Sequence, residues 1–174
     1  MKIWGFKMHV NKIQNYSSLN PNFHALRLKQ NSSRYLMSMP PKVFNKLDSV
    51  GEYLANTKFY HLDIGYDDFF ISHISSEKFY LPIMVNNAGN TLIIKAKQGA
   101  TPVTKKLKYS TSNEVSALYD HIKNSSTQLE RTAKIVKVLD EYEEKLKQQE
   151  QQIVINPAES KEDIINKLLK KYGI

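Results

Sequence analysis

The sequence predicts an α+β protein, in which a small antiparallel β-sheet or barrel-like N-terminal part precedes two or three helices, one of them long. Up to about residue 110, short apolar runs of strand length alternate with turn signals rich in Gly, Asn, Asp and Ser. Beyond that point the apolar residues recur at helical spacing. The chain has 174 residues, of which 41% are hydrophobic and 24% charged, so one core is expected.

The N-terminal runs are expected to form short strands separated by turns at 20–22, 30–33, 65–68, 86–90 and 98–100. The clearest hairpin lies within residues 80–97, where two β-branched runs flank a loop containing Gly89 and Asn90, residues that tolerate positive φ. The strands are predicted at 3–10, 25–29, 34–39, 58–64, 69–74, 79–85, 91–97 and 102–109.

The helical part begins where Thr111 and Glu114 have the spacing of a capping box. One apolar face follows, formed by Val115, Leu118, Tyr119 and Ile122. A longer helix of about 26 residues is then predicted from a one-sided stripe of Leu129, Ala133, Val136, Leu139, Tyr142, Leu146 and Ile153. A last short amphipathic helix is expected after Asn156, which can cap it, and Pro157, which suits its first turn.

The positive charge is concentrated in the β-rich part. Residues 1–110 contain 15 Lys or Arg and 6 Asp or Glu, a net charge of +9, whereas residues 111–174 contain 10 and 11, a net charge of −1. Such a field favours polyanionic partners, with nucleic acid ahead of acidic protein surfaces and anionic lipid. The alternative is a Lys-rich face that serves solubility and keeps sheet edges from pairing.

One basic segment is the strongest candidate for contact with phosphates. Within 14 residues that include no acid, it holds Lys95, Lys97, Lys105, Lys106 and Lys108. Lys95 and Lys97 are expected to share one strand face, as are Lys106 and Lys108. Such a patch gives affinity and salt sensitivity without reading bases. Aromatic residues nearby could stack on bases or belong to the core, namely Tyr60, Tyr66, Phe69 and Tyr80.

A second cluster, of His and Asp residues, is the only candidate for catalysis or metal binding. His61 and Asp63 would project from one strand face, as an acid and base pair or metal ligands do. Asp67 and Asp68 are typical of a hairpin turn, and His73 falls on the next strand. No cysteine and no GxGxxG, GxxxxGK, HExxH or GxSxG motif is present. We therefore expect a non-enzymatic protein without cofactor or metal site.

The segment RYLMSMPPKVFNKL, residues 34–47, runs from strand-like alternation through two prolines into a short helical pattern. Pro40 lacks an amide donor and can end a strand, and Pro41 suits the first position of a helix. In the order of their predicted strands, turn and helix, this segment and its neighbours resemble the swapped-hairpin DNA-binding domain of the AbrB/SpoVT transition-state regulators. Arg34 matches the turn arginine of that family, Met39-Pro40 the apolar-proline step, and residues 42–47 the helix.

The resemblance covers residues 24–74 and departs from the family at three points. Ser33 replaces the turn glycine, Pro41 is an additional proline, and residues 48–56 form an insertion. In the family two chains interleave their hairpins and basic residues of the first hairpin contact DNA. The resemblance therefore implies a homodimer with DNA contacts from Arg27, Lys29, Arg34 and Lys42.

These observations together predict a non-enzymatic, dimeric, cytoplasmic DNA-binding regulator, with DNA favoured over RNA as the ligand and no membrane association. No run reaches the length of a signal peptide core or the roughly 18 apolar residues of a spanning helix. The expected regions are a basic nucleic-acid-binding part at 1–110, a packing or dimerisation part at 111–155 and a short helix at 156–174. The alternative is a small inhibitor from a virus or mobile element that binds a host protein.

Overall fold

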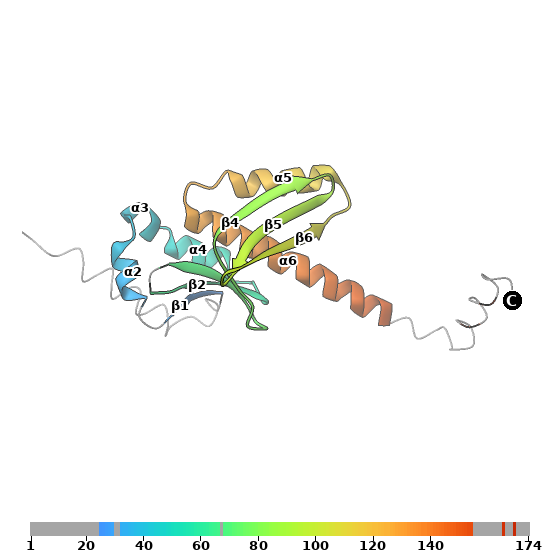
Figure 1. Cartoon of the computed structure of the whole chain (residues 1–174), viewed down its shortest axis with the longest axis horizontal. Helices are drawn as coiled ribbons and strands as arrows, with labels where there is room; N and C mark the ends of the chain where they lie inside the picture. Colours follow the sequence, from blue (N-terminus) through green and yellow to red (C-terminus); the bar gives the residue numbers. More distant parts are fainter. Residues whose placement is uncertain (1–24, 30–31, 67, 155–164, 166–168, 170–174) are drawn as a thin grey trace, which may run out of the picture. The chain divides into compact units, whose positions relative to one another are not determined.

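Figure 1 shows the chain in a computed structural model that describes residues 25–29, 32–66, 68–154, 165 and 169. The chain divides into two compact units, Met1–Glu141 and Tyr142–Ile174. The strand predicted at 3–10 lies outside the described residues, as does the helix predicted at 156–174 apart from residues 165 and 169. None of the helices in the described part of the chain combines the length and the apolar character needed to span a membrane.

The first unit contains a six-stranded sheet whose strands lie side by side in chain order, from β1 at one edge to β6 at the other. Strands β2 to β6 form an antiparallel meander, and β1 pairs with β2 in parallel. The α+β prediction is confirmed. The strands are β1 (Leu26–Leu28), β2 (Tyr60–Ile64), β3 (Phe69–His73), β4 (Lys78–Ala88), β5 (Thr91–Gln98) and β6 (Thr101–Lys108).

Two tight turns join the last three strands. Ala88 pairs with Thr91, and Gln98 pairs with Thr101, so each hairpin loop has two residues. Each loop begins with a glycine of positive φ, 56° at Gly89 and 60° at Gly99. Glycine adopts this backbone conformation without the steric cost that a Cβ atom adds, and such loops match the twist of the strands they join. The predicted hairpin between residues 80 and 97 is therefore confirmed.

The strand predicted at 34–39 is wrong, because α2 (Ser33–Ser38) occupies this segment. Leu36 and Met39, three positions apart, are both buried, whereas Met37 between them is 63% exposed. This is the burial pattern of a helix turn, and it outweighs the strand-like alternation. Two further short helices follow, α3 (Pro41–Phe44), with Pro41 in its first turn as predicted, and α4 (Leu47–Tyr53). The three helices lead the chain from the end of β1 back to its start, so that β2 runs parallel to β1.

The helices after the sheet match the prediction. The side chain of Thr111 accepts a hydrogen bond from the backbone N–H of Glu114 and caps α5 (Ser112–Lys123). The long helix is α6 (Gln128–Val154), with 27 residues. Its first half buries the first four residues of the predicted stripe, Leu129, Ala133, Val136 and Leu139, whereas Leu146 of the same stripe is 42% exposed. Dimerisation through this helix stays a prediction.

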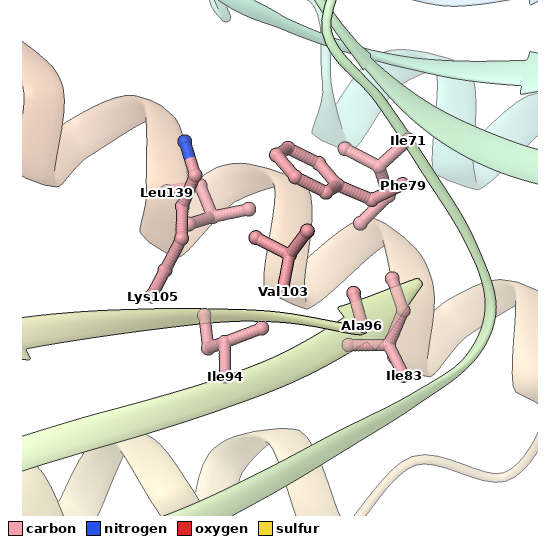
Figure 2. Close-up of a pocket in the computed structure, with 8 residues that line it drawn as sticks. All are labelled: Ile71, Phe79, Ile83, Ile94, Ala96, Val103, Lys105 and Leu139. Carbon is pink, nitrogen blue, oxygen red and sulfur yellow. The ribbon is translucent and has the colours of Figure 1, made fainter. Parts of the chain in front are cut away.

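The helices cover one face of the sheet. Alternate strand residues on that face are almost fully buried, among them Leu62, Ile71, Ile83, Leu92 and Ile94. Helix α5 contacts β4 and β5, and α6 brings Leu139 against side chains of β3 to β6. Figure 2 shows the small apolar pocket between α6 and the sheet, which Lys105 also lines. The space in this pocket, about 10 Å³, is that of a single water molecule.

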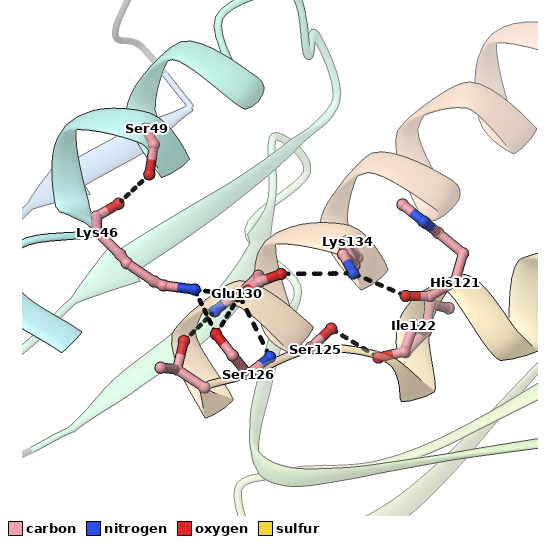
Figure 3. Close-up of polar contacts among 9 residues, drawn as sticks. Lys46, Ser49, His121, Ile122, Ser125, Ser126, Glu130 and Lys134 are labelled. Carbon is pink, nitrogen blue, oxygen red and sulfur yellow. Dashed lines mark hydrogen bonds and ion pairs between the residues drawn. The ribbon is translucent and has the colours of Figure 1, made fainter. Parts of the chain in front are cut away.

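A polar network connects the segment between β1 and β2 with the start of α6 (Figure 3). The Lys46 ammonium donates to the side chains of Ser126 and Glu130, and its distance to Glu130 Oε2 is 2.7 Å. Ser126 Oγ donates to the same carboxylate oxygen at 2.7 Å. These hydrogen bonds lower the pKa of Glu130 from its ordinary 4.5 to about 2.

We expect the stabilising effect of Glu130 to depend on pH. A carboxylate with a lowered pKa stabilises the fold fully above pH 4.5, and this contribution is lost as the pH falls towards 2. Glu130→Gln should therefore lower the free energy of unfolding at pH 7 by up to about 1 kcal/mol. The partial exposure of the Lys46–Glu130 ion pair sets this limit. Urea unfolding of both proteins between pH 7 and 3 measures the difference, which should shrink below pH 4.5. A difference independent of pH would contradict the assignment.

Candidate nucleic-acid interface

The second face of the sheet is exposed along β4, β5 and β6. In an antiparallel sheet, paired residues on neighbouring strands project to the same side. The register pairs Tyr80 with Lys97, Met84 with Lys95, and Ile93 with Lys106. We define the open sheet face by nine of the residues on this side, away from the helices: Phe70, Lys78, Tyr80, Met84, Lys95, Lys97, Thr104, Lys106 and Lys108.

Lysines dominate this face at β5 and β6. Two of them come from β5 and two from β6, and all four side chains are exposed: Lys95, Lys97, Lys106 and Lys108. No Asp or Glu occurs in the described residues of these two strands. The register places Lys106 beside Ile93 and Lys108 beside Thr91, so the four lysines follow one another along the strand direction at steps of about 7 Å. Their charges therefore add to one cationic strip.

Lys105 does not lie with them, although it is the neighbour of Lys106 in the chain. It pairs with Ile94 on the helix-covered face, and its ammonium donates to Tyr60 Oη at 2.7 Å and lies 3.4 Å from Glu77 Oε2. Burial alone would lower the pKa of Lys105, but these two partners outweigh it and the pKa lies above its ordinary value. The structure thus places Lys105 among core residues, as Figure 2 shows.

Aromatic and apolar side chains extend the open sheet face towards β3. Phe70 and Tyr80 are cross-strand partners, with ring centroids 5.6 Å apart and ring planes inclined by 33°. The Lys78 ammonium lies 5.8 Å from the centroid of Phe70. Tyr80 is 41% exposed and Met84 58%. Of the four aromatic candidates in the sequence, Tyr60 and Phe69 are buried and Tyr66 contacts Arg34, so Tyr80 alone lies on this face.

Asp63 is the cross-strand partner of Phe70, on the same side of the sheet, and its buried carboxylate joins β1, β2 and β3. Arg27 donates to it through Nε at 2.6 Å and through a terminal nitrogen at 3.0 Å, and Ser72 Oγ donates at 2.5 Å. Lys29 Nζ lies 3.4 Å away. Burial alone would raise the pKa of Asp63, but the hydrogen bonds from Arg27 and Ser72 and the nearby positive charges outweigh it, and the pKa is lowered. Arg27 and Lys29 are therefore already engaged by an internal anion.

His61, the partner of Asp63 in the predicted cluster, is also buried, and its Nδ1 has no hydrogen-bond partner in the described part of the chain. Burial, followed by the charge of Arg27, lowers the pKa of His61, so the ring is neutral at pH 7. Among the described residues no three His, Asp or Glu side chains group closely enough to hold a metal ion. Asp67 lies outside the described residues.

The remaining two predicted contacts, Arg34 and Lys42, come from helices. Arg34 lies on α2, donates to Tyr66 Oη and stacks 5.4 Å from the centroid of that ring. Lys42 is exposed on α3. The structure thus brings together four of the nine predicted cations on one face of β5 and β6 and places the other five elsewhere.

Comparisons of the chain with protein-family models, with curated proteins and with solved structures gave no significant match. The resemblance to the AbrB/SpoVT domain stays a prediction. The open sheet face is therefore interpreted from its own residues. Sequence reasoning missed Phe70, Lys78 and Met84 as members of this face. The signal that could have found the first two is the strand alternation itself, since Phe69 and Phe79 are buried and their neighbours Phe70 and Lys78 project to the opposite side.

Proposed function

We propose that the protein binds nucleic acid, without catalysing a reaction, through the open sheet face. The observation that supports this most directly is the strip of four exposed lysines on β5 and β6, in two strands that carry no acidic residue. A polyanion with regularly spaced charges complements such a strip. Each lysine that neutralises a phosphate releases a condensed counterion, and this release drives binding at low salt.

The position of the strip in the fold also supports the proposal. Strands β4 to β6 are joined by two-residue loops and packed on their other face against α5 and α6, so the lysines project from a well-supported surface. Phosphate contacts of this kind give affinity and orientation but carry no base information. We therefore expect weak sequence preference, and both DNA and RNA need to be measured.

The dependence of binding on salt tests the proposal. With oligonucleotides of mixed sequence and the full chain, log Kd should rise with log salt concentration with a slope of about 3 or more, because four phosphate contacts each contribute about 0.7 to 0.9. Fluorescence anisotropy at a series of salt concentrations gives this slope. Absence of binding to any DNA or RNA at low salt would overturn the proposal and favour an acidic protein surface as the partner of this face.

A further inference from the structure

The open sheet face contains a feature that phosphate binding alone does not need. Phe70 and Tyr80 lie side by side in β3 and β4, and Tyr80 is 41% exposed. Their neighbours in the same strands, Phe69 and Phe79, are each 4% exposed on the helix-covered face, so Phe70 and Tyr80 project away from that core. This pair, the half-buried Phe70 beside the exposed Tyr80, is therefore a candidate for contact with a ligand.

Two lysines lie beside this aromatic pair, while its neighbour on β2, Asp63, is buried and paired with Arg27. Lys78 Nζ lies 5.8 Å from the Phe70 centroid, and Tyr80 is the direct partner of Lys97 on β5. The next pair along the same strands combines Met84, 58% exposed, with Lys95. Apolar surface and positive charge thus alternate over β3, β4 and β5. A ligand that fits this surface presents flat apolar groups and negative charges at short, repeated intervals.

We propose that the open sheet face binds single-stranded nucleic acid, with unpaired bases stacked on Tyr80 and Phe70 and the backbone phosphates placed on the neighbouring lysines. This inference rests on the proposed function and specifies its ligand. In a duplex the bases are already stacked on one another, so a duplex uses the lysines but not the rings. A single strand exposes the faces of its bases to aromatic side chains.

Substitution at Tyr80 tests the inference, with the full chain and single-stranded oligothymidine, oligouridine and a mixed-sequence duplex of the same length as probes. Tyr80→Ala should raise the Kd for the single strands by about 5- to 150-fold, the effect of one lost stacking contact, and leave the Kd for the duplex unchanged. Tyr80→Phe, the matched control, keeps the ring and should bind single strands as the parent protein does. Phe70→Leu, which keeps apolar volume but not the ring, provides a second variant should Tyr80→Ala unfold.

The outcomes separate this inference from the proposed function. Salt-dependent binding that is equal for single strands and duplex, and that neither Tyr80→Ala nor Phe70→Leu weakens in folded protein, would overturn stacking and leave phosphate binding intact. No binding of any probe at low salt would overturn both. Selective weakening of single-strand binding by Tyr80→Ala, with Tyr80→Phe unchanged, would support the inference.

Discussion

We expect nucleic-acid binding to weaken by about 10³- to 10⁴-fold when Gln replaces the four open-face lysines, Lys95, Lys97, Lys106 and Lys108, because each lost phosphate contact is worth about tenfold at roughly 50 mM salt. Gln keeps the length and polarity of the side chain and removes only the charge. The slope of log Kd against log salt should also fall by about 3, since it counts the phosphate contacts. Anisotropy titrations of parent and variant at several salt concentrations measure both quantities.

The matched control removes the same net charge from helices. Four lysines of α5 and α6 are replaced by Gln in this second variant, Lys123, Lys137, Lys145 and Lys147. If position on the open sheet face matters, the control binds within a fewfold of the parent and keeps its salt slope. Equal weakening by both variants would show that overall charge drives binding. Thermal unfolding of each variant verifies that the fold is kept.

The largest expected effect on stability comes from Asp140 on α6. Asp140 is 3% exposed. It accepts hydrogen bonds from three successive backbone N–H groups at the start of β2, those of Lys58 at 2.9 Å, Phe59 at 2.6 Å and Tyr60 at 2.9 Å. Asp140→Ala should lower the free energy of unfolding by about 3 to 5 kcal/mol, because three donors lose this acceptor where water has little access. Denaturant unfolding at pH 7 measures the loss.

Two further variants show whether the effect comes from these hydrogen bonds. Asp140→Asn retains one oxygen acceptor without charge and should lose about half as much stability, since bonds to a charged acceptor are about twice as strong. Glu141→Ala, at the next and exposed position of the helix, should change stability by less than about 0.5 kcal/mol. A small effect of Asp140→Ala would mean that the carboxylate does not anchor β2 to α6.

Local patterns in the sequence were sufficient for most of the fold. Strands β2 to β6 follow runs of β-branched and aromatic residues, and the turns at Gly89 and Gly99 are set by the positive φ that glycine adopts without cost. The cap at Thr111 and the stripe on α6 are likewise properties of neighbouring residues. The segment 34–39 was ambiguous, because a six-residue apolar run fits either a strand or a turn and a half of helix until its burial is known.

The candidate interface was predictable only in part. Alternation along β5 and β6 was enough to place Lys95 with Lys97 and Lys106 with Lys108, because side chains in a strand alternate between faces. That these two pairs share one exposed face depends on the register between β5 and β6 and on which face the helices cover.

The sequence by itself thus determined the α+β class, the hairpins, the two helices that follow the sheet and the basic character of the β-rich part, all of which arise from residues close in the chain. Only the tertiary structure decided which partner each charged side chain binds. Arg27 donates a hydrogen bond to the buried Asp63, 36 residues away, and Lys105 donates one to Tyr60, 45 residues away. A buried charge needs a partner because desolvation is costly, and the choice of partner depends on contacts that only the folded chain brings together.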